Sequence, residues 1–452
     1  MKRRVGLFDR RKGKGKKVVV IGPDGTPLSL VQKLIVQGEL PNFQRIFKDG
    51  SVRPMTSAIP SVSSVAWSSF MTGKNPGKHG IYGFLDRRPN TYDTYIPNAA
   101  VMRAETLWEI LSRHGKRVVV MNVPVTYPPR QVNGILVGCF LSPKLEKATY
   151  PPQVAEQLKN MGYRIDVDPW QAREDRDKFL EDLYYTLDKR EEAMDHFMKT
   201  EDWDFFMLQI METDRLHHFL WEEMETGDPK YAPAFLKLYH KLDALLGRLY
   251  DRLGEDTTLI VMSDHGFTLM KKEVYINRWL EDHGWLSFTK QPPESLNDIH
   301  PDSRAYSMDP GRIFINLRGR EPRGSVDLGK DYEDVRSELI DSLSGLSDPD
   351  SGEPMIEKVY RREEIYSGEC YAQAPDLVAM PYRGYDLKGS IKKDVLTDRG
   401  VINGAHTYDD AMLYIQGEDI QKDEASIVDV MPTILHLMGV PIPQDVDGAV
   451  LI

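Results

Sequence analysis

The sequence lacks the features that mark exported and membrane-spanning proteins. It has only two cysteines, Cys139 and Cys370, which cannot form a disulfide framework. No apolar run reaches the roughly 18 residues that a membrane-spanning helix needs. The chain begins with basic residues, but no apolar segment follows them as it would in a secretory signal. These absences predict a soluble cytoplasmic protein without a transmembrane segment.

Charge is unevenly distributed along the chain. Residues 1–17 contain nine Lys or Arg and one Asp, a net +8; because the whole chain carries −11, the remaining residues carry −19. We expect residues 1–17 to form a basic, solvated N-terminal arm. The acidic remainder disfavours nucleic acid as a partner, because a phosphate backbone needs a broad basic face. A small anionic substrate would instead need cations bound locally.

The chain also lacks internal repeats and long low-complexity segments, and its 41% hydrophobic content is ample for a core. Short apolar runs alternate with helical patterns, which predicts an α/β fold with a mostly parallel central sheet and helices on both faces. The charged, partly amphipathic residues 141–200 and the turn-rich residues 285–400 are expected to be cap or lid segments inserted into this fold. The runs predicted as strands are 17–23, 117–122, 135–140, 205–210, 258–262, 312–316, 376–380 and 411–415.

The stretch Ile59–Gly83 contains a cluster of serines at the predicted start of a helix. Its sequence, IPSVSSVAWSSFMTGKNPGKHGIYG, becomes helix-like after the first serines, and Gly73 ends that helix. Ser61, Ser63 or Ser64 would therefore lie near free N–H groups that attract an anion such as a phosphoryl oxygen. On these residues alone, a simple helix cap is the more common role for such a serine.

Acidic and histidine residues follow several of the predicted strands. Each has an ordinary explanation when considered alone, such as a turn, a helix cap or a surface ion pair. Asp214 and His218 are four residues apart, so on a helix they would share one face; His217 is the rival at three residues, and we favour His218. The candidate metal-ligating residues are Asp24, Asp214, His218, Asp264, His265 and His406.

Taken together, three carboxylates and three imidazoles suffice for two divalent cations with open positions. Mixed nitrogen and oxygen ligation suits Zn²⁺, with Mn²⁺ or Fe²⁺ as alternatives. Two such ions about 4 Å apart can deprotonate a serine hydroxyl and bind a phosphoryl oxygen between them. The serine would then attack the phosphorus in line and form a phosphoseryl intermediate, which hydroxide resolves.

In these residues the sequence resembles the alkaline phosphatase superfamily, and most closely its type I phosphodiesterase/nucleotide pyrophosphatase branch, especially the prokaryotic intracellular members. The resemblance covers nearly all of residues 18–452, so we expect them to form one alkaline-phosphatase-like catalytic domain. The motifs that carry it occur in the family's order: VVVIGPDG, IPSVSSVAWSSFMTGKNPGKHGI, ETDRLHH, SDHGF, GAH and VDVMPTILHLMGVPIP.

The resemblance implies specific roles. The family places its nucleophile three positions after a proline, which selects Ser63 here, and the backbone N–H of Ser64 would help to bind the phosphoryl oxygen. The family has an Asn shortly after the HGI segment, where this chain has Phe84, and this departure weakens the expectation of a nucleotide diester as substrate. The implied metal ligands form two sets, with Asp214, His218 and His406 in one and Asp24, Asp264 and His265 in the other.

Three other functions compete with hydrolysis of a small phosphodiester. A phosphomonoesterase or a phosphomutase of the phosphoglycerate mutase type would use the same site, but those mutases carry a large domain inserted soon after the nucleophile, and here strand-like segments resume by Arg117. Hydrolysis of a phosphonate or a sulfate ester is another alternative, but a sulfatase would need a C/S-x-P-x-R motif, which Ser63 and the residues after it do not match. A binding protein on a degenerate scaffold would have lost ligands, and all six are present.

Overall fold

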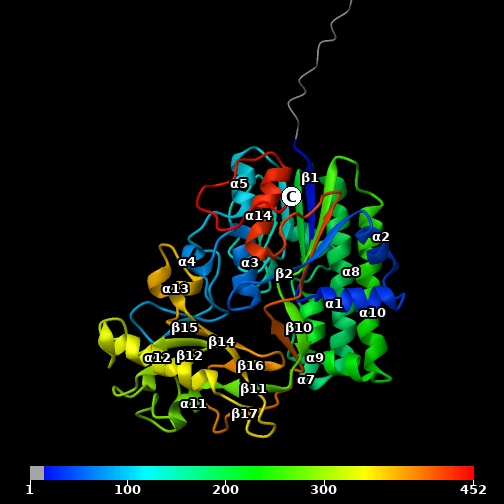
Figure 1. Ribbon diagram of the computed structural model, residues 1–452. Helices are drawn as coiled ribbons and strands as arrows, with labels where there is room; N and C mark the ends of the chain where they lie inside the picture. The colour runs from blue at the N-terminus through cyan, green and yellow to red at the C-terminus, as the bar shows by residue number, and fades with distance from the viewer. Residues whose placement is uncertain (1–14) are drawn as a thin grey trace, which may run out of the picture.

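The computed structural model describes residues 15–452, in which a nine-stranded sheet forms the centre of the molecule (Figure 1). Its five inner strands, from β9 to β6, are parallel, whereas β19 runs antiparallel to both of its neighbours and β7 runs antiparallel to β6. The predicted mostly parallel sheet is therefore confirmed. In order across the sheet the strands are β20 (Ala425–Ser426), β2 (Gly50–Thr56), β19 (Ala411–Gln416), β9 (Thr257–Met262), β1 (Lys17–Pro23), β8 (Phe205–Ile210), β5 (Val118–Met121), β6 (Gly134–Val137) and β7 (Thr149–Tyr150).

Helices cover both faces of this sheet, as predicted. Alternate residues of β1 enter two different cores, because successive side chains of a strand point to opposite faces: Val19 and Ile21 pack into one core, Val18 and Val20 into the other. The first core contains α1 (Leu28–Val36), α2 (Pro41–Phe47), α6 (Val154–Asn160), α8 (Arg176–Thr200), α9 (Glu212–Thr226) and α10 (Tyr231–Tyr250). The second contains α3 (Ser63–Thr72), α5 (Leu107–Arg113) and α14 (Val430–Leu437).

A second, smaller layer is built from the residues between β9 and β19. An antiparallel four-stranded sheet packs with two helices around its own core, at the lower left of Figure 1. A three-stranded sheet borders it, and the antiparallel pair of β10 and β18 connects it to the central sheet. The elements are α11 (Ile276–Asp282), α12 (Lys330–Ser344), β12 (Ala305–Met308), β13 (Arg312–Ile315), β15 (Leu377–Pro381) and β14 (Ile356–Arg361), then β16 (Tyr385–Lys388), β11 (Lys272–Tyr275) and β17 (Thr397–Asp398), and finally β10 (Gly266–Leu269) and β18 (Gly404–Thr407).

Short elements complete the described chain. Two small strands pair beside the second layer, and several short helices join the larger elements. They are β3 (Asp86–Arg87), β4 (Thr94–Tyr95), α4 (Pro76–His79), α7 (Gln171–Glu174) and α13 (Arg362–Ile365), with the 3₁₀ turns η1 (Leu145–Lys147), η2 (Leu296–Asp298), η3 (Tyr371–Gln373) and η4 (Ile427–Asp429).

The expected N-terminal arm and cap segments correspond only in part to elements of the fold. Residues 1–14 of the arm lie outside the described residues, and Lys17 already begins β1. Within the segment 141–200, α8 packs into the core beside the central sheet, whereas residues 142–145 and 164–173 contribute to the wall of a large cavity. That the segments 141–200 and 285–400 act as caps stays a prediction.

The strand expected at 135–140 is shorter than predicted. β6 ends at Val137, and a turn follows in which the N–H of Ser142 donates to the carbonyl of Cys139 at 2.9 Å. Phe140 therefore lies outside the sheet and lines the cavity.

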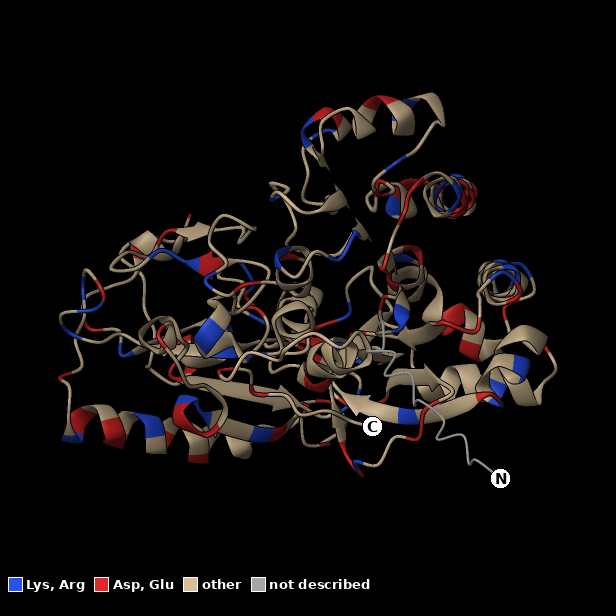
Figure 2. Cartoon of the chain, turned by 90° about the horizontal axis from the view of Figure 1, so that it is seen from above, with Lys and Arg blue, Asp and Glu red and all other residues tan. Residues whose placement is uncertain are grey.

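The surface carries both signs of charge. Figure 2 shows Lys and Arg interspersed with Asp and Glu along the outer helices. None of the helices in residues 15–452 is both long and apolar enough to cross a membrane.

Candidate active site

The three acidic candidates lie together at the carboxyl ends of three neighbouring strands of the central sheet. β9, β1 and β8 are neighbouring parallel strands, so their carboxyl ends lie together. Asp24 follows β1, Asp264 follows β9, and Asp214 lies in the first turn of α9 directly after β8. All three carboxylates are buried.

Ser63 is the first residue of α3 and lies against this cluster. Its Oγ is 3.2 Å from Oδ1 of Asp24 and 3.2 Å from Nε2 of His265. Trp67, one helical turn later on the same face, donates from its indole nitrogen to Oδ2 of Asp24 at 2.7 Å. The Trp67 contact therefore fixes the start of α3, and with it Ser63, against the end of β1.

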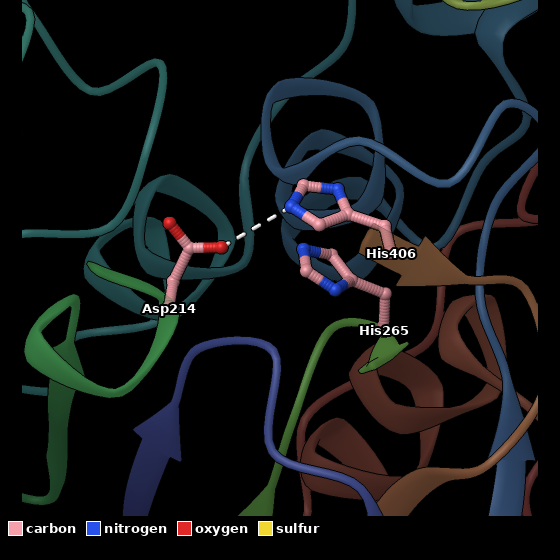
Figure 3. A group of neighbouring side chains, drawn as sticks. All are labelled: Asp214, His265 and His406. Carbon is pink, nitrogen blue, oxygen red and sulfur yellow. Dashed lines mark hydrogen bonds and ion pairs between the residues drawn. The ribbon is translucent and has the colours of Figure 1, made fainter. Parts of the chain in front are cut away.

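The remaining histidines reach the same centre from other elements. His406 lies on β18, whose pairing with β10 sets it opposite Phe267, two residues after His265. Nε2 of His406 is 3.2 Å from Oδ1 of Asp214 and 3.0 Å from Nε2 of His218. Figure 3 shows the rings of His265 and His406 beside Asp214; their centroids are 3.7 Å apart.

The hydrogen bonds of the three imidazoles assign their tautomers. In each ring Nδ1 faces a backbone carbonyl, which can only accept: the carbonyl of Gly404 for His218 at 3.0 Å, that of Gly266 for His265 at 3.0 Å and that of Ser61 for His406 at 3.1 Å. Nδ1 must then carry the hydrogen, which leaves Nε2 as the basic nitrogen directed into the centre. This arrangement is typical of metal-ligating histidines, whose other nitrogen is held by an acceptor.

The electrostatics of the centre call for positive charge. Burial, reinforced by the charge of Asp214, raises the pKa of Asp24 to about 7. Burial also raises the pKa of Asp264 well above its ordinary value, and Oδ2 of Asp264 has no hydrogen-bond partner within residues 15–452. Burial lowers the pKa of His265 well below its ordinary value, so this imidazole is neutral. A divalent cation beside these groups would supply the missing charge and the missing partner.

The donor atoms fit two cations. Asp24, Asp264 and His265 each offer one ligand atom within 4.8 Å of the others, and so do Asp214, His265 and His406. His218 extends the second group, because its Nε2 is 3.4 Å from Oδ1 of Asp214. The structure thus brings together all seven side chains that the sequence singled out as nucleophile and ligands.

His217 does not face this centre. Its Nδ1 is 2.9 Å from the carbonyl of Gly25 and its Nε2 is 2.9 Å from the hydroxyl of Tyr239, and burial lowers its pKa to about 3. It is a neutral core histidine that connects α9 to the turn after β1 and to α10. The geometry agrees with the preference for His218.

Three residues with polar groups beside the centre were not predicted from the sequence. Besides Trp67, Gln209 donates to Oδ2 of Asp24 at 2.7 Å, and Arg215 lies 2.7 Å from Asp166 and 3.4 Å from Asp214. A signal existed for Gln209, because it is the only polar residue in the apolar strand Phe205–Ile210, and a buried polar group needs a partner. Nothing in the local pattern marks Arg215.

A cavity of about 1020 Å³ opens over the site. Ser63, Asp214, His218 and His406 contribute to its floor, and the second layer contributes β15 and β16 residues to its wall. Most of the exposed lining surface is apolar. The centre is therefore accessible to a ligand much larger than a phosphate ion.

The fold, the clustered acidic and histidine residues and the family match together identify this protein as an α/β enzyme of the alkaline phosphatase superfamily. Residues 18–409 match the family model described as type I phosphodiesterase/nucleotide pyrophosphatase, and the chain belongs to this family. It is accordingly an enzyme that hydrolyses phosphoric esters, in a family of enzymes that depend on divalent metal ions.

Solved structures share the fold at low sequence identity. Phosphonoacetate hydrolase from Sinorhizobium meliloti 1021, in complex with phosphonoformate, superposes with a TM-score of 0.66 at 18% identity, over 96% of this chain and 98% of that one. Murine ectonucleotide pyrophosphatase/phosphodiesterase 5 gives 0.58 at 18% identity, over 96% and 98%. The human form gives 0.56 at 16% identity, over 96% and 97%. The chain matches no curated protein sequence.

Proposed function

We propose that the protein is a two-metal phosphodiesterase in which Ser63 is the nucleophile. The observation that carries the proposal is the position of Ser63, at the start of α3, with its Oγ 3.2 Å from both an aspartate and a histidine of the buried cluster. Of the three serines left open by the sequence pattern, Ser63 makes these contacts. Ser64 directs its hydroxyl away, donating to the carbonyl of Gly83 at 2.8 Å.

Two ligand sets support the proposal. Asp24, Asp264 and His265 would hold one divalent ion, and Asp214, His218 and His406 the other, with Zn²⁺ preferred for mixed nitrogen and oxygen ligands and Mn²⁺ or Fe²⁺ as alternatives. When bound, the ions would act as Lewis acids that favour the serine alkoxide and withdraw charge from the phosphoryl oxygens.

The protein's own groups would position the reacting atoms. Oδ1 of Asp24 and Nε2 of His265 lie within reach of the Ser63 hydroxyl and hold it at the end of β1. The N–H groups of Ser63 and Ser64, in the first turn of α3, have no carbonyl of their own helix to bond and can donate to a phosphoryl oxygen. Attack by Oγ on phosphorus would expel one ester alcohol and leave a phosphoseryl intermediate that keeps the second ester group. Water would then hydrolyse this intermediate, which releases a phosphomonoester and frees the serine.

The shape of the cavity favours a diester over a monoester. A monoester needs room for one organic group, whereas the cavity of about 1020 Å³ extends from Ser63 both to β15 and β16 and to the segment 164–173. Its mainly apolar lining suits an organic substituent better than a bare phosphoryl oxygen. We propose a small phosphodiester as the substrate.

We expect the metal-loaded protein to cleave bis(p-nitrophenyl) phosphate faster than p-nitrophenyl phosphate, with a ratio of kcat/KM of about tenfold or more. Both compounds release the same chromophore, so the ratio reports the second ester group. Activity should disappear after chelation and return with Zn²⁺ or Mn²⁺. A preference for the monoester would indicate a phosphomonoesterase or a phosphomutase instead. If the protein binds no metal and cleaves neither compound, the proposed function is wrong.

The two neighbouring histidines of α9 should respond differently to substitution. His217→Phe should lower the free energy of unfolding by about 1–3 kcal/mol, because the Gly25 carbonyl and the Tyr239 hydroxyl lose their partner. Its metal content should stay that of the wild type. His218→Phe should weaken metal binding by about 100-fold or more. It should lower the free energy of unfolding of the metal-free protein by less than His217→Phe does. Metal titration and denaturant unfolding of both variants test this; metal loss in the His217 variant alone would reverse the assignment.

A further inference from the structure

The segment after α4 holds an aromatic side chain beside the candidate nucleophile. The carbonyl of Gly83 accepts the Ser64 hydroxyl at 2.8 Å, so residue 84 follows directly from a contact with the first turn of α3. Phe84 lines the cavity, and 40% of it remains exposed. A large aromatic side chain left open at the entrance of a reaction site is available to a ligand.

The backbone around Phe84 is rigidly held. The guanidinium of Arg312 donates to Oδ1 of Asp86 at 2.6 Å and to the carbonyl of Leu85, and the N–H of Tyr82 donates to Oδ2 of Asp86 at 3.0 Å. Gly83 packs so closely against Arg312 that a Cβ there would lie 2.3 Å from the guanidinium. The position of Phe84 is therefore preorganised.

Phe84 is the outer member of a stack that leads back to the metal-binding candidates. Its ring is nearly parallel to that of Phe140, at 6° and with centroids 6.2 Å apart. The Arg215 guanidinium lies 5.2 Å from the centre of the Phe140 ring. The same guanidinium forms an ion pair with Asp166 and lies 3.4 Å from Asp214. Cation–π contact and the ion pairs hold Phe140 in place, and Phe140 in turn supports Phe84.

We propose that Phe84, supported by Phe140 and Arg215, is a stacking platform that selects phosphoryl substrates bearing a planar aromatic group. A flat ring gains from an aromatic face by offset stacking as well as by burial, whereas an alkyl group gains by burial alone. The platform lies beside Ser63, so the stacked group would be one attached directly to the phosphoryl centre. This inference rests on the proposed function, since it places the phosphoryl group at Ser63.

Binding of two non-hydrolysable probes tests the platform without relying on turnover. Calorimetric titration of the metal-loaded protein with phenylphosphonate and methylphosphonate should show about tenfold tighter binding of the phenyl compound. In Phe84→Leu the affinity for phenylphosphonate should fall close to that for methylphosphonate, while methylphosphonate binding stays within about twofold of the wild type. Phe84→Tyr keeps a ring and should keep the preference.

A matched control separates the platform from a general effect of removing an exposed ring. Tyr382 is 42% exposed and lies outside the cavity lining, so Tyr382→Leu should leave both affinities unchanged. The proposal is overturned if the wild type does not prefer the phenyl compound, or if Phe84→Leu keeps the preference. It is also overturned if neither phosphonate binds. The proposed function is read separately, from metal-dependent cleavage of the nitrophenyl diester, so its failure is distinguishable from that of the platform.

Discussion

Ser63→Ala should abolish turnover while leaving the metal content unchanged. We expect kcat/KM for bis(p-nitrophenyl) phosphate to fall by about 10³-fold or more, because no other side chain in the centre can replace the attacking oxygen. The alanine removes one hydroxyl from a buried position that already lies at a helix start, so α3 should still form with Trp67 on Asp24. Steady-state assays and metal analysis of the same preparation test both parts.

Ser61→Ala is the matched control for this variant. Ser61 lies two residues away and contributes its backbone carbonyl, not its side chain, to the contact with His406. The turnover of Ser61→Ala should remain close to that of the wild type. Rapid acid quenching of the wild type with this diester should also leave a phosphoryl group that still carries one nitrophenyl ester on the peptide that contains Ser63, and the alanine variant should show none. If Ser63→Ala retains activity and Ser64→Ala loses it, then the nucleophile is Ser64 and not Ser63.

The fold could be predicted from local pattern wherever burial dominates. The strands at Lys17–Pro23 and Phe205–Ile210 have the predicted limits, since continuous apolar runs can be stable only inside a sheet covered on both faces. β2 was not predicted, because Gly50–Thr56 is a largely exposed strand at one side of the sheet with no continuous apolar run. Phe140 was assigned to a strand because an aromatic residue after an apolar run continues the pattern, but in the structure it lies in the turn between Cys139 and Ser142.

The candidate site was predictable as a set of residues but not as a geometry. Spacing on α9 allows both His217 and His218, and the choice depends on how the helix packs against the end of β1, a contact across 192 residues of sequence. Gln209 lies 185 residues from Asp24, and their hydrogen bond follows from the pairing of β8 with β1. Such partners are determined by strand order, which no local pattern encodes. Phe84 was noticed as a departure from the family pattern, but its stacking on Phe140 required the structure.

Asp264→Asn should have opposite effects on the metal-free and the metal-loaded protein. Asparagine can still accept the Gly25 N–H, which Oδ1 of Asp264 now accepts at 3.0 Å, and its amide would point toward Nε2 of His265, now 3.4 Å from Oδ2. The substitution removes a buried negative charge beside a second buried carboxylate, Asp24. Burial raises the pKa of both Asp24 and Asp264. The metal-free variant should therefore unfold at a higher temperature than the metal-free wild type near pH 8.

The pH dependence of this difference has a definite sign. Because burial raises the pKa of Asp264 above 3.8, its ordinary value, the folded wild type binds this proton more tightly than the unfolded chain does. The carboxyl group therefore costs no stability below pH 3.8 and costs progressively more as the pH rises through its raised pKa. The stabilising effect of the asparagine should grow from pH 5 to pH 8 in the presence of chelator. An equal effect at both values would show that the metal-free folded protein does not bind this proton more tightly than the unfolded chain, so that the pKa of Asp264 is not raised.

We expect metal to reverse the order of the two melting temperatures. The wild type should gain thermal stability on addition of Zn²⁺ or Mn²⁺, because a cation that binds only the folded state shifts the unfolding equilibrium by mass action. The asparagine variant loses a charged ligand and leaves Asp24 and His265 as the remaining donors of that set, so its affinity should fall by about 100-fold or more and most of the gain should vanish. Thermal scans with chelator and with metal therefore give four midpoints. If the variant is less stable than the wild type under chelation and gains as much from metal, then Asp264 is a structural aspartate that does not bind a cation.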